Sequence, residues 1–579
     1  MRLTRHLLPG LCLALAAVAA PAADVDWPTH GLDAQSTRHS PLADIDQGNV
    51  SRLTEAWTFR SGVKGTFQAT PVVVDGRMFV GLPSSHVVAL DARTGQELWR
   101  YRHQTRPGFK PCCGPANRGV AVAEGKVFLG ALDARLIALD AATGQVLWDT
   151  DVARQADSDV DTTAMATSMS DVVRAGDALA RQSVTGGQGI GIGMAPLVAG
   201  KRVIVGTNGA GYGVHTEGAV IGAEDQRAPS AVMAAFDIDT GKPLWRFRVT
   251  GPGWEGPMRA TTADHLPVYR EIAQERRALP KHKEAWRHGG GSLYSTPAWD
   301  PARDWIFFGT GNPAPNMEGD TRPGDNLHTS SLVALDARTG RLVWYHQQVP
   351  HDLWGYDVAS TPVLFDLKQG GRTRPAVAQP SKLGWVYVYD RASGRLLFRS
   401  DRFVPQSNFM ARANESGVVL APGIAGGANW SPSAYDAASG QLVVPGIDMP
   451  TRYRRGTSPS GIAFVATEFA EKRRGTLTAL DLQHGGRLRW QRQLDEPAIG
   501  GLLSTAGGLL FTGIGDRTFA ALDARTGDTL WQSKRSAGVN APPITYRVGA
   551  QQFIAVAVGG NSLFGMPTGD ELAVFRLPD

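Results

Sequence analysis

The chain has 579 residues, of which 42% are hydrophobic and 20% are charged, and its formal net charge is +5. This composition is typical of a folded globular protein and excludes a disordered, low-complexity chain. A charge so close to neutral gives no indication of nucleic-acid binding. A chain of this length ordinarily forms several domains, unless it is built from repeated units that pack on their neighbours.

The first 23 residues predict a secretory signal peptide. They begin with Arg2 and Arg5, continue as the apolar run LLPGLCLALAAVAA and end in small residues. Cleavage there would remove Cys12 and leave a mature chain, 24–579, with a net charge of about +3. No later run reaches the roughly 18 apolar residues of a membrane-spanning helix. We therefore expect a periplasmic protein with no transmembrane segment in the mature chain.

A repeat of Asp, three residues, Gly, three residues and a large apolar residue, usually Trp, runs along the chain, as in ALDARTGQELW ending at Trp99. The Asp and Gly predict a tight turn between two strands, and the Trp predicts a side chain wedged between neighbouring sheets. From Asp336 onward the copies are 54, 46, 45 and 42 residues apart, which is the length of a four-stranded propeller blade. The eight copies have their aspartates at Asp91, Asp140, Asp237, Asp336, Asp390, Asp436, Asp481 and Asp523.

The repeat predicts an all-β fold, an eight-bladed β-propeller of four-stranded antiparallel blades. Two longer spacings, of 97 and 99 residues, indicate insertions in blades three and four. We expect the stretch around Trp57 and the final strand ELAVFRLPD to complete one shared blade. Residues 262–287 are charged and helix-prone, which predicts a surface lid or loop excursion. A propeller that serves only for interactions would show the same repeat.

Cys112 and Cys113 are adjacent and are the only cysteines of the mature chain. A disulfide between them would be strained, because adjacent Cα atoms lie about 3.8 Å apart and a disulfide normally spans about 5.5 Å. Such strain is usually tolerated only where it serves a site. From the residues alone, a reduced and buried thiol pair is an equal alternative.

Several segments between the predicted strands are richer in Gly, Asn and aromatic residues than a blade requires. They are PCCGPANRG (111–119), GTNGAGYGV (206–214), GGGSLYSTP (289–297), GTGNPAPN (309–316), RPGDNLHTSS (322–331), PSKLGWVYVYDR (380–391) and GGANWSPSAYD (426–436). In this order they resemble the quinoprotein alcohol dehydrogenases, eight-bladed exported enzymes that use pyrroloquinoline quinone (PQQ) with a divalent or lanthanide metal. The resemblance covers essentially the whole mature chain, from DWPTHGLDAQSTRHSPL to APPITY.

The resemblance implies a periplasmic enzyme that oxidises an alcohol or polyol to the carbonyl, with PQQ and Ca²⁺ or a lanthanide as cofactors. The chain has no CxxCH motif for a c-type haem, so we expect an external cytochrome c or quinone to accept the electrons.

The same resemblance assigns roles to individual residues. It implies a Cys112–Cys113 disulfide against one face of the quinone. Asp325 matches the catalytic base, near the metal. Lys382 matches the basic residue that polarises the quinone carbonyls, and Asn312 matches a metal-binding asparagine. The matched cofactor-lining residues are Gln68, Arg118, Asn208, Gly209, Ala210, Ser292, Tyr294, Asn429 and Trp430. Without the family, Asn312 and Asp325 are ordinary turn residues.

Three positions depart from the family pattern. Gln68 stands where Glu is common, and Tyr294 stands where Trp is common. Gly211 stands where the family has a metal-binding Glu, which should weaken metal binding. The candidates for a replacement carboxylate are Glu217, Glu224 and Asp225. Alternatively, the quinone's own carboxylate and Asp325 hold the metal, or metal and activity have been lost.

Two other functions compete with the alcohol dehydrogenase. One is a non-catalytic propeller, such as an outer-membrane assembly scaffold or a ligand-binding relative, or a decayed quinoprotein. The cysteine pair, Arg118 and Lys382 favour the enzyme, whereas Gly211 favours this alternative. The other is a sugar dehydrogenase of the same cofactor class, whose membrane-bound versions carry an N-terminal span.

Overall fold

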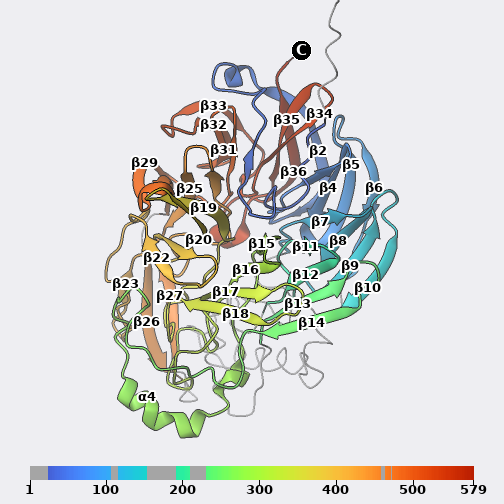
Figure 1. Cartoon of the computed structure of the whole chain (residues 1–579). Helices are drawn as coiled ribbons and strands as arrows, with labels where there is room; N and C mark the ends of the chain where they lie inside the picture. Colours follow the sequence, from blue (N-terminus) through green and yellow to red (C-terminus); the bar gives the residue numbers. More distant parts are fainter. Residues whose placement is uncertain are drawn as a thin grey trace, which may run out of the picture.

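In a computed structural model of the chain, the described residues are 24–105, 115–152, 191–208, 230–457, 463–470 and 473–578. Their strands form a ring of antiparallel sheets, with the first strand of each sheet toward the centre and the last at the periphery (Figure 1). The prediction of an eight-bladed propeller of four-stranded sheets is confirmed. The predicted signal peptide at 1–23 and the cysteine pair lie outside the described residues, so both stay predictions.

Blades one to five each contain four consecutive strands. Blade one holds β3 (Val72–Val74), β4 (Arg77–Leu82), β5 (His86–Asp91) and β6 (Glu97–Tyr101), and blade two holds β7 (Val120–Ala123), β8 (Lys126–Gly130), β9 (Arg135–Asp140) and β10 (Val146–Asp151). Blade three holds β11 (Leu197–Ala199), β12 (Arg202–Gly206), β13 (Val232–Asp237) and β14 (Pro243–Arg248), and blade four holds β15 (Ala298–Asp300), β16 (Trp305–Gly309), β17 (Ser331–Asp336) and β18 (Leu342–Gln347). Blade five holds β19 (Val363–Gln369), β20 (Arg372–Pro380), β21 (Val386–Asp390) and β22 (Leu396–Arg399).

The last three blades depart from this pattern. Blade six holds β24 (Ala434–Asp436), β25 (Gln441–Asp448), β28 (Arg474–Asp481) and β29 (Arg487–Leu494); blade seven holds β30 (Leu503–Thr505), β31 (Leu509–Ile514), β32 (Thr518–Asp523) and β33 (Thr529–Lys534), with β1 (His39–Ser40) added beside β30; and blade eight holds β34 (Ile544–Val548), β35 (Gln551–Val558), β36 (Gly569–Arg576) and β2 (Thr54–Gly65). The pairing of β2 with β36 confirms that the two ends of the chain share a blade.

The repeated Trp joins a blade to the next, except in blade five, where Phe398 stands in its place. The Trp245 indole N–H donates to the Ala337 carbonyl of the following blade at 2.8 Å. Its ring lies against Gly340, where an added Cβ would be 2.5 Å from the indole, and the φ of Gly340 is +70°. The same indole-to-carbonyl bond is made by Trp99 to Ala141, Trp148 to Ile238, Trp344 to Arg391 and Trp490 to Ala524. Trp57 of β2 packs on Gly95 of blade one and so closes the ring.

One predicted copy of the repeat is wrong as a blade marker. Asp436 ends the first strand of blade six, whereas the other copies' aspartates end the third strand of their blades. Its side chain still caps the turn through Ala438 and Ser439, which explains the sequence likeness. The spacings of 46 and 45 residues on either side of Asp436 therefore belong to one long blade, blade six. The eighth blade has no copy of the repeat and is the one that β2 completes.

The extra length of blade six is a separate three-stranded sheet. It consists of β23 (Val418–Leu420), β26 (Thr451–Thr457) and β27 (Ala463–Phe469), and the β26–β27 hairpin is inserted between β25 and β28. The predicted excursion before blade four is also present. It contains α4 (Ile272–Ala278), η3 (Leu279–His282) and η4 (Ala285–His288), and α4 lies at the outer edge in Figure 1.

A segment near the N-terminus crosses the innermost strands of four successive blades. Arg38 at its end is fully buried, and its Nε and Nη2 donate to the carbonyls of Leu502 and Pro543. The segment therefore ties blades four to eight together from inside the ring. Its carbonyls accept the inner-strand amides as follows: Ala34 from Trp299, Gln35 from Leu364, Thr37 from Tyr435 and Arg38 from Ser504.

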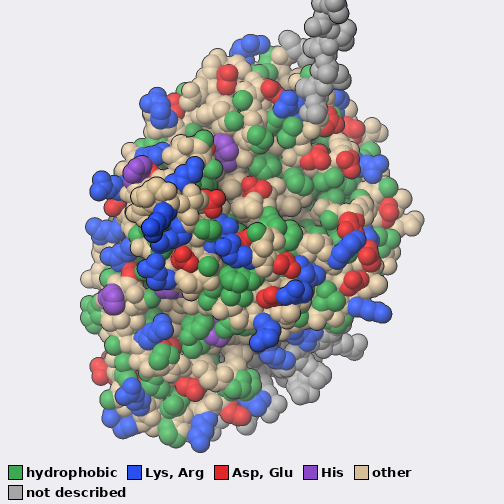
Figure 2. Space-filling view, in the orientation of Figure 1, with side chains coloured by type: hydrophobic (Ala, Val, Ile, Leu, Met, Phe, Trp, Pro, Cys, Tyr) green, Lys and Arg blue, Asp and Glu red, His purple; other side chains and the backbone are tan. Residues whose placement is uncertain are grey.

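On the outside, Lys and Arg side chains alternate with Asp and Glu over most of the face in view (Figure 2). This mixed surface fits the near-neutral net charge. Among the described residues, none of the helices has the length and apolar character that crossing a membrane requires.

The Trp contact can be tested with two glycines of nearly equal φ. Gly340→Ala places a methyl group against Trp245, whereas Gly76→Ala, at φ +69°, meets nothing within 4 Å. We expect Gly76→Ala to cost about 1–2 kcal/mol through backbone strain alone, and Gly340→Ala about 2–4 kcal/mol because overpacking is added. Thermal denaturation of the two variants checks this order. Equal midpoints would contradict the docking role of Trp245.

Candidate functional site

The predicted site residues share one position in their blades. In an antiparallel sheet, the start of the first strand and the end of the second lie at the same edge. Gln68, Arg118, Tyr294 and Asn429 come just before a first strand, and a second group comes just after a second strand. That second group consists of Asn208, Asn312 and Lys382. The fold therefore brings all of them to one rim of the ring.

Asp357 joins three of the predicted residues. Its Oδ1 accepts the backbone N–H of Asn312 at 2.7 Å. Its Oδ2 accepts the Tyr294 hydroxyl at 2.7 Å and the Lys382 ammonium at 3.0 Å. Lys382 also donates to the carbonyl of Gly355 at 2.8 Å. This buried carboxylate is the centre of the site.

Asp357 is absent from the sequence prediction, although a signal for it exists. It lies six residues before β19, much as Tyr294 and Asn429 lie four and five residues before their own first strands. The segment PHDLWGYD that contains it follows β18 and offers three aspartate and histidine side chains in eight residues. Attention to the position before each first strand would have singled out Asp357.

Arg118 lies between two aromatic rings of the site. Its guanidinium carbon is 5.6 Å from the Tyr294 ring centroid and 5.4 Å from that of Trp430. One guanidinium nitrogen donates to the Gly193 carbonyl at 3.2 Å. The Arg118 Nε, the Asn208 Oδ1 and the Trp430 Nε1 are buried and have no hydrogen-bond partner among the described residues.

The remaining predicted residues border this group. Thr70, two residues after Gln68, donates its amide to the Arg118 carbonyl at 3.1 Å. Ser292 accepts the amide of Gly311, next to Asn312, at 2.9 Å. Asn429 follows Gly427, whose amide donates to the Lys382 carbonyl at 2.7 Å. The other predictions fall outside the described residues: Cys112, Cys113, Gly209, Ala210, Gly211, Glu217, Glu224 and Asp225.

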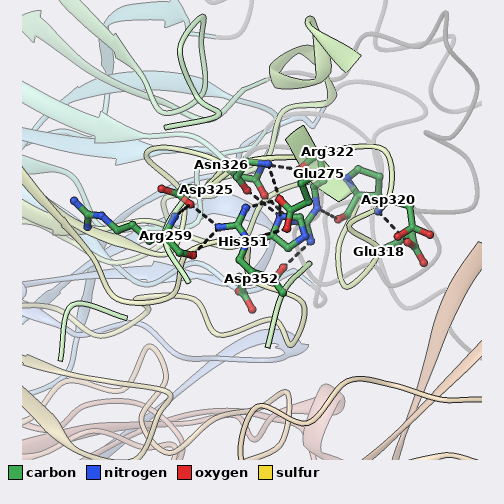
Figure 3. Close-up of polar contacts among 12 residues, drawn as sticks. Arg259, Glu275, Glu318, Asp320, Arg322, Asp325, Asn326, His351 and Asp352 are labelled. Atoms are coloured by element: carbon green, nitrogen blue, oxygen red, sulfur yellow. Dashed lines mark hydrogen bonds and ion pairs between the residues drawn. The ribbon is translucent and has the colours of Figure 1, made fainter. Parts of the chain in front are cut away.

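Asp325 makes different contacts. Its Oδ1 accepts the Arg259 amide at 2.8 Å and the Arg270 guanidinium at 2.5 Å. The described contacts of Asp325 include none to Asn312, Lys382 or Tyr294. Figure 3 shows it in a cluster with Glu275 and His351. Because Arg270 belongs to the excursion before blade four and Arg259 comes just before it, Asp325 fastens this part of the chain to the loop after β16.

The excursion is held by further charged contacts. Arg270 also pairs with Glu275, whose carboxylate accepts the Gly324 amide at 2.9 Å. Burial alone would raise the pKa of Glu275, but Arg270 and His351 lower it to about 2. Burial raises the pKa of Asp325 despite the pull of Arg259 and Arg270. These ion pairs therefore hold the excursion against the loop after β16; we call them the clamp.

Comparisons with known proteins identify the family of this chain. The model of the family "PQQ: Glucose/ethanol/alcohol dehydrogenase, beta-propeller domain" matches residues 27–416 and 466–554. The chain belongs to this family of PQQ-dependent quinoprotein alcohol dehydrogenases. Members are oxidoreductases that act on CH–OH groups.

Individual quinoproteins match over most of their length. The quinoprotein alcohol dehydrogenase PedH of Pseudomonas putida is 31% identical over 92% of this chain and 85% of its own. The 1-butanol dehydrogenase (cytochrome c) of Thauera butanivorans is 31% identical over 97% of this chain and 78% of its own. A europium-containing methanol dehydrogenase structure is 26% identical, with a TM-score of 0.75 over 96% of this chain and 98% of its own.

The described residues of this quinoprotein fit PQQ. A planar, anionic ligand needs fixed cations and aromatic walls. Arg118 and Lys382 supply buried cations, and Tyr294 and Trp430 supply the rings. The unpaired polar atoms of Arg118, Asn208 and Trp430 are buried donors and an acceptor that such a ligand would satisfy.

The described residues do not form a comparable metal site. Ca²⁺ takes six to eight oxygen ligands, several of them carboxylates. Among the described residues, no group of three or more His, Cys, Asp and Glu side chains is placed to hold a metal ion. Beside Asn312 they offer the carboxylate of Asp357, which already accepts three hydrogen bonds.

The clamp of the excursion predicts a pH-dependent stability. Glu275 has a folded pKa of about 2 against 4.5 for a free group, so its contribution is complete above about pH 4.5 and is lost as the pH falls toward 2. We expect Glu275→Gln to lower the free energy of unfolding by at most about 3 kcal/mol near neutral pH, with a smaller difference in acid. Thermal denaturation of both proteins across this range measures it.

Glu284→Gln is the control within the same excursion, because its side chain is 67% exposed. We expect that variant to match the unmodified protein at every pH. If the difference in stability between Glu275→Gln and the unmodified protein stayed constant down to about pH 3, the role of Glu275 in the clamp would be contradicted.

Proposed function

We propose that this quinoprotein oxidises an alcohol or polyol to the carbonyl in the periplasm, with PQQ as its cofactor and an external cytochrome c or quinone as its electron acceptor. The observation that carries the proposal is the joining of Tyr294, Asn312 and Lys382 through Asp357, beside Arg118. The relative named 1-butanol dehydrogenase (cytochrome c) supports the substrate class and the acceptor. The predicted signal peptide supports the periplasmic location.

PQQ, when bound, would supply the two-electron acceptor that takes a hydride equivalent from the alcohol carbon. Lys382 holds a positive charge in a buried place, 5% exposed, where it stabilises negative charge on the reduced quinone. Arg118 binds the anionic edge of the quinone through its free Nε. Tyr294 and Trp430 exclude water from the faces of the ring system.

Asp357 is the residue that we assign to the hydroxyl proton. A carboxylate has about four lone-pair sites, and the described donors use one on Oδ1 and two on Oδ2. Oδ1 therefore keeps one site for the proton of the substrate hydroxyl. Asp325 was the base predicted from sequence; its pairing with Arg270 on the excursion supports a structural role instead.

The cysteine pair completes the proposal. A Cys112–Cys113 disulfide would lie against the quinone, in a compartment that oxidises thiols. Cys113 lies five residues before Arg118 in the sequence.

Asp357→Asn tests the assignment directly. We expect the variant to bind PQQ but to lose at least about 100-fold in dye-linked alcohol oxidation, because an amide cannot take the hydroxyl proton. PQQ binding is followed by quenching of tryptophan fluorescence, and turnover by reduction of an artificial dye.

Asp366→Asn is the matched control, since Asp366 is exposed on β19 of the same blade. We expect it to retain full activity. Full activity of Asp357→Asn would show that Asp357 does not take the hydroxyl proton. If Asp325→Asn alone lost activity, Asp325 would be the base, as the sequence predicted. Failure of the unmodified protein to bind PQQ would favour a non-catalytic propeller.

A further inference from the structure

Two of the buried charges in the site balance each other. Lys382 and Asp357 form an ion pair in which the side chains are 6% and 12% exposed. The ammonium also donates to the Gly355 carbonyl at 2.8 Å. Removing two opposite charges from water together is far less costly than removing one alone, so each charge stabilises the other in this place.

The lysine is held in this position by the backbone beside it. Gly426 lies against the Lys382 stem, and an added Cβ there would clash with the lysine Cγ. The Gly427 amide donates to the Lys382 carbonyl at 2.7 Å, which fixes the chain on both sides of the contact. The ammonium is therefore aimed at Asp357 by packing as well as by charge.

Most lone-pair sites of the Asp357 carboxylate are already used and are not free to bind a metal ion. Three of its lone-pair sites are used by Asn312, Tyr294 and Lys382. Bidentate binding would displace one of the two donors on Oδ2. A divalent or trivalent cation at Asp357 would also meet the positive charge of Lys382 in a buried environment, where repulsion between like charges is strong.

We propose that this chain binds PQQ without a metal ion, and that the Lys382 ammonium supplies the positive charge that a metal would otherwise supply beside the quinone. The inference rests on the proposed function, because it concerns the binding of PQQ. It goes beyond that function by making the cofactor site independent of Ca²⁺ and lanthanides, and by giving Lys382 the role of the cation.

The test is a titration of the full chain with PQQ in EDTA, in Ca²⁺ and in La³⁺. We expect the three dissociation constants to agree within about threefold, and we expect elemental analysis of the quinone-loaded protein to find no stoichiometric metal. Binding that is more than about tenfold tighter with either cation, with one metal ion retained per chain, would overturn the inference and leave the proposed function intact.

Failure to bind PQQ in all three buffers would overturn the proposed function, and this inference with it. If Glu217, Glu224 or Asp225 holds a metal ion at the cofactor site, PQQ will bind more tightly in Ca²⁺ or La³⁺ than in EDTA.

Lys382→Gln provides a second readout. Without the ammonium, Asp357 is a buried carboxylate with no cation, so we expect PQQ binding in EDTA to weaken by at least about tenfold and Ca²⁺ or La³⁺ to restore part of it. Lys382→Arg keeps the charge and should bind PQQ in EDTA. Lys368→Gln, at an exposed position of β19, is the control and should bind as the unmodified protein does.

Circular dichroism establishes that each variant is folded before the titration. A folded Lys382→Gln variant that neither cation rescues would contradict the role assigned to the ammonium. If Lys382 acted through packing alone, the affinity of Lys382→Gln for PQQ would not change with Ca²⁺ or La³⁺.

Discussion

The fold depends on the contact between the Trp of one blade and the turn glycine of the next. The Trp245 indole both donates to Ala337 and covers Gly340, so one side chain fixes the distance and the rotation between two sheets. Repeating this contact sets the angle between blades, and Trp57 makes it once more across the junction of the chain's ends. Because neighbouring sheets are rotated by a fixed amount, their inner strands converge on a common centre.

The site follows from that convergence. Loops at one rim place Arg118, Tyr294, Asp357 and Lys382 within contact of one another although they come from three different blades. The segment at 34–38 ties the inner strands of four blades together, which keeps the rim from spreading. A rigid rim suits a flat cofactor, because the cations and rings that bind it are already in position before it arrives.

The periodic parts of this architecture were predictable from the sequence. The Asp–Gly–Trp spacing identified the blades, and Trp57 identified the closure, because each reflects a local turn and a fixed packing contact. The Asp436 copy misled, since a capped turn looks the same after a first strand as after a third. The contacts of Asp357 and of Asp325 were not predictable, because they depend on which loops meet across the ring. Sequence spacing carries no record of those contacts.

Lys382 and Asp357 are the charged centre of the proposed quinone site, beside Tyr294 and Trp430. A crystal structure of the protein grown with PQQ tests this most directly. The expected result is density for the planar quinone beside Tyr294 and Trp430, with Lys382 at its edge and no anomalous signal from a metal. Quinone density away from Lys382, or an ion bound between the quinone and Asp357, would contradict it.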